Sequence, residues 1–136
     1  MKRRIIAAAL VLVFPFSMAA CSSQSKTAAC KEIEKARDAA LAEAQKGNID
    51  YTDEKALKDY FQKITDVYKK SLKKVKNKKV KPVFQSFIAD MERIIELYDD
   101  GDTMFSSKEF DSAMTDMENH GKKLSDLCGF GWNIGS

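Results

Sequence analysis

The sequence has few of the residues that make turns, with two proline and six glycine residues among 136. An all-β domain needs turn residues about every 8 to 12 positions, so this scarcity argues against one. A hydrophobic share of 44% and a charged share of 32% exclude both a disordered chain and a multi-span membrane protein. The length allows one domain or two very small ones.

Residues that bind metals or act as nucleophiles are also scarce, because the chain has one histidine and three cysteines. Cys30, Cys128 and His120 do not make the four ligands that a zinc site needs. Neither cysteine has a nearby histidine or a Cys-x-x-Cys partner, so a catalytic thiol is not expected. We therefore expect no metal and no cofactor, and an enzyme is the least favoured class of function.

The first twenty residues have the layout of an export signal. Lys2, Arg3 and Arg4 precede an unbroken apolar run from Ile5 to Phe14, and Pro15 ends any simple helix. The 16 residues from 5 to 20 are short for a hydrocarbon core of about 30 Å. A basic start, a short apolar run and small residues indicate a signal peptide over residues 1–20.

The end of this segment, Met18-Ala19-Ala20-Cys21, resembles the lipobox of bacterial lipoproteins. Met18 stands where that family usually has leucine. The resemblance implies that diacylglycerol is attached to the Cys21 sulfur and that cleavage leaves Cys21 as the acylated N-terminus. It also implies a lipid anchor on the extracytoplasmic face of the cell membrane. The resemblance covers about 21 of the 136 residues and gives no fold for the rest.

Two other interpretations of this segment remain open. One is an ordinary secretory signal that is cut after Ala20 and leaves Cys21 free. The other is an unprocessed signal anchor, against which Pro15 and the short length count. The polar residues 22–25 favour the lipoprotein, because a flexible tether over 21–27 would follow the lipid. Two or more acyl chains give stable anchoring, whereas one chain binds marginally.

The remaining cysteines, Cys30 and Cys128, are 98 positions apart. An exported chain enters a compartment that permits disulfides, so two leftover thiols are most simply a bridge. Such a bridge would close nearly the whole of a single domain over 28–136.

This domain carries four apolar stripes at helical spacing, which predicts four helices. Gly47-Asn48 ends the first, Thr52 or Asp53 caps the second, Pro82 lies in the first turn of the third, and Gly129 caps the end of the fourth. A capping box of Ser106 and Glu109 is expected at the start of the fourth. The stripes are Cys30, Ile33, Ala36, Ala40, Leu41 and Ala44; Leu57, Tyr60, Phe61, Ile64, Val67, Tyr68, Leu72 and Val75; Phe84, Phe87, Ile88, Met91, Ile94, Ile95 and Tyr98; and Phe110, Met114, Met117, Gly121, Leu124 and Cys128.

Helices of similar length joined by short turns favour an all-α, up-down-up-down four-helix bundle closed by the disulfide. In that topology the start of the first helix and the end of the fourth lie at the same end, where Cys30 and Cys128 meet. A three-helix array with the first helix packed elsewhere is the main alternative.

Positive and negative charges are nearly equal in number but are divided unevenly between the two halves of the chain. Removal of the signal leaves 20 basic and 20 acidic residues, with a net charge of +7 over 21–81 and −7 over 82–136. We expect part of this asymmetry to be used in ion pairs between helices. Eight lysines fall within 13 residues of the corner between the second and third helices: Lys69, Lys70, Lys73, Lys74, Lys76, Lys78, Lys79 and Lys81.

These lysines have two interpretations. They form either a solvated helix end, favoured by the helix dipole, or a contact surface for anionic lipid or an anionic envelope polymer. In the predicted bundle the corner lies at the end of Cys30 and the lipid. Nucleic-acid binding is not expected, because no aromatic residues alternate with the lysines.

Other candidate sites are weaker. No register of Asp99-Asp100-Gly101-Asp102 places glycine and glutamate as an EF-hand requires, so specific calcium binding is not expected. Ser112, Asp116 and His120 share a helix face, but a triad needs histidine in the middle. A simple pair of His120 with Asp116 is compatible with this spacing. Met91, Met104, Met114 and Met117 are expected to fill the core.

The segment 129–134 carries two aromatic residues after the last helix, Phe130 and Trp132. They form either a lid over the base of the bundle or an exposed contact for a partner.

Taken with the absent catalytic constellation, these features favour a non-catalytic binding or interaction module at the cell envelope, with an unknown protein partner. The alternatives are a carrier of a small apolar ligand or lipid between the second, third and fourth helices, and an inhibitory or immunity-type lipoprotein.

Overall fold

The computed structural model describes residues 24–99 and 107–131, and within these ranges it contains four helices and no strand. The helices are α2 (Lys26–Gln45), α3 (Glu54–Leu72), α4 (Val80–Asp99) and α5 (Lys108–Cys128). The predicted all-α class and the four helices are confirmed. The first helix begins at Lys26, inside the stretch that the sequence assigns to the tether.

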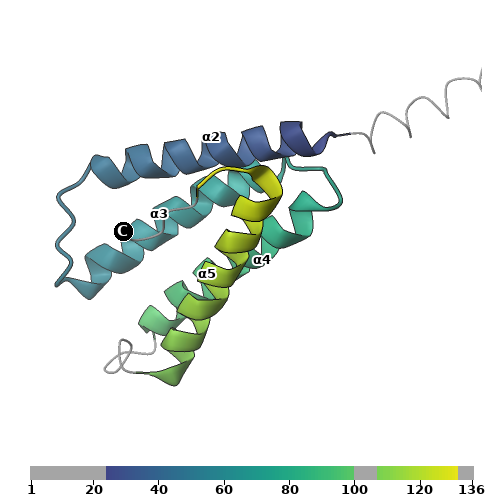
Figure 1. The fold of residues 1–136 in the computed structure, drawn as a ribbon. Coiled ribbons are helices and arrows are strands. Elements are labelled where there is room, and N and C mark those ends of the chain that lie inside the picture. The colour runs from purple at the N-terminus through teal and green to yellow at the C-terminus, as the bar shows by residue number, and fades with distance from the viewer. Residues whose placement is uncertain (1–23, 100–106, 132–136) are drawn as a thin grey trace, which may run out of the picture.

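Successive helices lie against one another, α2 with α3, α3 with α4 and α4 with α5 (Figure 1). The close contacts of α2 with α4 and α5 are few by comparison. Figure 1 shows that α2 and α5 diverge from a common end, where the C-terminal end of α5 meets the start of α2. This shared end is where the two cysteines meet.

Polar side chains cap the starts of α2, α3 and α5. Ser25 Oγ accepts a hydrogen bond from the Ala28 amide, and Asp53 accepts from the amides of Lys55 and Ala56. Ser107, not Ser106, is the cap of α5, because its Oγ accepts from the Phe110 amide. The predicted capping box was wrong by one residue, which leaves Glu109 too early in the helix to complete it.

Gly129 ends α5 as predicted. Its backbone has φ of 72°, in the left-handed region that glycine adopts without steric cost, and its amide donates to the carbonyl of Ser125 over 2.7 Å. This turn directs the chain after Cys128 away from the helix axis.

The core is built mainly by α3, α4 and α5. Tyr68 of α3 meets Phe84 and Phe87 of α4 edge to face, with ring centroids 5.9 and 5.7 Å apart. Met91 and Met117 are buried, and Met114 packs against the same cluster, so three of the four predicted core methionines are confirmed. Met104 lies outside the described residues. Helix α2 adds mostly small side chains: Ala29, Cys30, Ile33, Ala36 and Ala40.

Two buried hydroxyl groups are satisfied by backbone carbonyls. Thr65 donates to the carbonyl of Phe61 in its own helix, and Ser71 donates across to the carbonyl of Glu32 in α2. Among the described residues, no buried side-chain nitrogen or oxygen lacks a hydrogen-bond partner. The Ser71 bond gives α2 a specific polar contact to α3.

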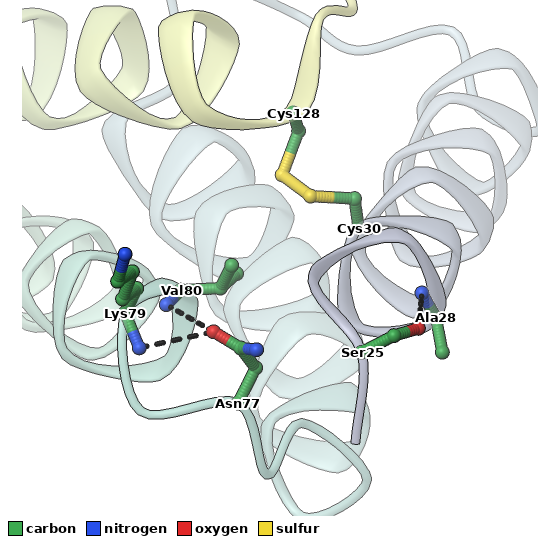
Figure 2. Close-up of a disulfide and its surroundings, with 7 residues drawn as sticks. All are labelled: Ser25, Ala28, Cys30, Asn77, Lys79, Val80 and Cys128. Carbon is green, nitrogen blue, oxygen red and sulfur yellow. Dashed lines mark hydrogen bonds between the residues drawn. A yellow bond between two sulfur atoms is a disulfide. The ribbon is translucent and has the colours of Figure 1, made fainter. Parts of the chain in front are cut away.

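Cys30 and Cys128 lie at disulfide distance, with Cα atoms 5.4 Å apart (Figure 2). The predicted bridge therefore has the geometry that it needs. It connects the first turns of α2 to the last residue of α5.

Replacing both Cys30 and Cys128 with serine should lower the free energy of unfolding by about 3–5 kcal/mol, because the bridge restrains a long loop in the unfolded chain. Urea unfolding of the oxidised protein and of the double variant measures the difference. Wild-type protein treated with a reductant should match the variant. Equal unfolding midpoints for the oxidised and reduced proteins would contradict this prediction.

Burial raises the pKa of the Tyr68 phenol well above its usual value near 10. Because the raised pKa belongs to the folded state, the stabilisation that it reflects is complete below about pH 10 and is lost as the pH rises further. We expect absorbance at alkaline pH to show a phenolate that forms only on unfolding. Tyr68→Phe should remove this late component and reduce the alkaline loss of stability. A full tyrosinate signal from the folded wild-type protein would oppose it.

Candidate functional site

The eight lysines between positions 69 and 81, called the lysine corner here, end α3, follow the connecting turn and begin α4. Seven of them are exposed and Lys81 is half-buried. The chain has no acidic residue between Asp66 and Asp90, so no carboxylate lies within the lysine corner itself. The corner is therefore a dense patch of positive charge on the surface.

One of these lysines forms an ion pair between helices. Lys69 Nζ lies 2.6 Å from Glu92 of α4, and this hydrogen bond raises the pKa of Lys69. Within the described part of the chain, the other seven ammonium groups have no carboxylate partner. The expected ion pairing between helices is thus present at Lys69. The other lysines of the corner stay available to an external anion.

Apolar anchors and one asparagine hold the turn in shape. Val75 and Val80 are fully buried on either side of it. Asn77 Oδ1 accepts hydrogen bonds from the amides of Lys79 and Val80, at 3.0 and 3.2 Å, and so caps the start of α4 (Figure 2). Because the valines point inward and the cap fixes the backbone, the intervening lysines are left on the outside.

Gln24, three positions after Cys21, is bound to this turn. The side chain of Gln24 donates to the carbonyl of Lys74 over 2.9 Å and accepts from the amides of Lys76 and Asn77. The Asn77 side chain also donates to the Gln24 carbonyl over 3.0 Å. Four hydrogen bonds thus join the first described residue to the lysine corner.

The disulfide lies at the same end of the molecule, beside the Asn77 cap and the start of α2 (Figure 2). An open depression of about 450 Å³ lies next to it, between the first turns of α2 and the end of α5. Its lining includes Lys26, Glu34, Asp126 and Phe130 and is both polar and apolar. This depression does not lie between α3, α4 and α5, where the alternative function of a ligand carrier would place an apolar molecule.

Phe130 is half-buried and packs against the core. The Arg37 guanidinium lies over its ring, 5.2 Å from the centroid, and donates to the carbonyl of Gly131. This arrangement fits the lid interpretation for Phe130. Trp132, the second aromatic residue of the segment, lies outside the described residues.

No family model matches this chain, and no curated protein or solved structure resembles it. The function therefore has to be inferred from the residues and their geometry.

The polar row on α5 does not form the pair expected from its spacing. His120 Nδ1 lies 2.5 Å from Asp90 of α4, and Asp116 pairs with Arg93 of α4 at 3.3 Å. The pair of His120 with Asp116 that the spacing allows does not form, because α4 runs alongside α5 and offers a closer partner to each side chain. Ser112 is exposed. The row links two helices.

Several predicted features lie outside the described residues. They are the signal peptide, Cys21, and the acidic loop from Asp100 to Asp102; the Asp99 side chain is likewise not described. Among the described residues no group of three or more histidine, cysteine or acidic side chains is placed to hold a metal ion. Over the same ranges, no helix is both long and apolar enough to cross a membrane.

Gln24 is the residue of the candidate site that the sequence pattern does not reveal. Its neighbours Ser22, Ser23 and Ser25 give the segment the composition of a flexible tether, and composition carries no information about a partner 50 positions away. The only local signal is that Ser25 can cap a helix. That signal would have placed the start of the folded domain at about residue 25 instead of 28.

Asn77→Ala should lower the free energy of unfolding by about 1 kcal/mol, because two amides at the start of α4 lose their acceptor. Asn77→Asp keeps the acceptor oxygen for both amides and loses only the donor to the Gln24 carbonyl, so it is the control for the cap and should be more stable than the alanine variant. Thermal unfolding, with hydrogen exchange at the Val80 amide, measures both effects. An alanine variant as stable and as protected as the wild type would show that the cap does not hold this turn.

Proposed function

We propose that this protein is a lipid-anchored lipoprotein on the extracytoplasmic face of the cell membrane, where it acts as a non-catalytic binding module for an anionic surface. The observation that carries the proposal is the lysine corner, which has seven unpaired ammonium groups and whose turn is hydrogen-bonded to Gln24, three positions after Cys21. Anchor and cations would then act at the same end of the molecule.

Three features support the location. The first 20 residues have the order of an export signal. Cys21 follows two small residues, as in lipoproteins. The remaining two cysteines lie at disulfide distance, and disulfides persist in oxidising compartments outside the cytoplasm.

We infer further that the four helices alternate in direction, as in an up-down-up-down bundle. The bonds of Gln24 to the α3–α4 corner and the bridge from Cys30 to Cys128 support this topology. They require the start of α2, the end of α3 and the end of α5 to share one end, and alternation meets that requirement.

The charge distribution favours binding through one local cluster of charge over binding through the net charge of the whole chain. With the signal removed, the chain has equal numbers of basic and acidic residues, so it has no net charge with which to attract an anionic surface. Attraction to an anionic surface must come from a local cluster. Each lysine near such a surface contributes about 1 kcal/mol, and salt reduces this contribution.

The proposal is tested on the mature chain with Cys21 replaced by serine, so that no lipid contributes to binding. Changing Lys74, Lys76 and Lys79 to glutamine should weaken co-sedimentation with phosphatidylglycerol vesicles by about 100-fold at low ionic strength, because about 3 kcal/mol of attraction is removed.

The charge-matched control changes Lys46, Lys55 and Lys63 to glutamine. Lys46 and Lys55 lie at the opposite end of α2 and α3, and Lys63 lies in the middle of α3. This control should leave binding close to that of the unmodified chain. Equal losses in both triple variants, or no loss in either, would overturn the proposed surface contact.

A further inference from the structure

The hydrogen bonds of Gln24 leave very little free chain between the predicted anchor and the folded domain. Cys21 and Gln24 are three positions apart, so their Cα atoms can be separated by at most about 11 Å. Without these hydrogen bonds the free segment would extend to the start of α2 at Lys26. Because four hydrogen bonds hold Gln24 to the folded domain, only the residues between Cys21 and Gln24 separate an anchor from that domain.

The residues that hold Gln24 are part of the lysine corner itself. Its partners are the backbone of Lys74 and Lys76 and both backbone and side chain of Asn77. The limit of about 11 Å between Cys21 and Gln24 is comparable to the Debye length of about 8 Å at physiological ionic strength. An anchor at Cys21 brings these cations within electrostatic range of the headgroups of its own bilayer.

We propose that Gln24 fixes the orientation of the anchored domain, so that the lysine corner docks on the anionic phospholipid headgroups of the same bilayer that holds the Cys21 acyl chains. This inference rests on the proposed lipid anchor. So short a connection keeps the lysine corner next to the membrane that holds the anchor. The corner can therefore reach the headgroups around the anchor, but not a polymer or a second membrane that lies far from it. Anchoring also makes this contact intramolecular, which raises its effective concentration.

The opposite end of the molecule then points away from the bilayer. The 20 residues of α2 span about 30 Å, and the connection between α2 and α3 lies beyond its far end (Figure 1). Tyr51 in this connection is 73% exposed, the most exposed large hydrophobic residue among those described. If the lysine corner faces the lipid, Tyr51 lies at the end of the molecule that points away from the bilayer.

The test uses the full chain, processed in cells, with its mature mass measured first. Lys78→Cys in the corner and Asn48→Cys at the far end provide two single labelling sites, both exposed in the structure. Each labelled protein is reconstituted into vesicles of phosphatidylcholine and phosphatidylglycerol that carry a quencher on the headgroups. We expect strong quenching at position 78 and little at position 48.

The role of Gln24 is isolated by raising the salt to about 1 M, where the Debye length falls to about 3 Å and lysine attraction is screened. Under these conditions Gln24→Ala should reduce quenching at position 78 by roughly twofold or more, because the freed segment lets the domain rotate about its anchor. Gln85→Ala, an exposed change on α4, is the matched control and should behave as the wild type. Thermal unfolding of each variant confirms that the fold is retained.

The outcomes separate the two proposals. A mature chain without a lipid-sized mass increment on Cys21 would overturn both the anchor and the orientation. An acylated chain whose far-end label is quenched as strongly as the corner label would overturn the orientation alone. An acylated, folded Gln24→Ala protein with unchanged quenching at high salt would overturn the role of Gln24.

Discussion

The contact between Cys30 and Cys128 is the restraint on which the position of α2 depends. The buried side chains of α2 are mostly alanines, and burial free energy scales with apolar area. The large buried residues lie mainly on the other helices, among them Phe84, Phe87, Ile94 and Leu124. Helix α2 packs along α3 and buries Ile33 completely, and two specific links add to this packing: the bridge to α5 and the bond from Ser71 to its backbone.

Much of this architecture follows from local sequence rules. The spacing of apolar residues predicts four helices because a helical face repeats every three to four positions, and the structure contains those four. Asp53 and Gly129 terminate helices as expected, since each acts on its own neighbouring backbone. The cysteine pairing could be predicted because, with Cys21 assigned to the lipid, only two thiols remain.

The errors have a common cause in polar contacts between segments distant in the sequence. His120 meets Asp90, and Gln24 meets the turn at Asn77, and neither contact has a local signature. The shift of the α5 cap from Ser106 to Ser107 is a different error, because two adjacent serines satisfy the same local rule. For the candidate site, the sequence locates the lysines but not the segment bound to them.

The bridge also has a consequence for the rates of folding and unfolding. Most helix contacts join neighbours in the chain, and topologies dominated by such local contacts fold rapidly. The bridge, by contrast, joins positions 98 apart and closes only once α2 and α5 have met. Once formed, the bridge already holds the start of α2 near the end of α5 in the unfolded chain, so refolding no longer has to close that long loop. We therefore expect the oxidised chain to refold faster than the reduced chain.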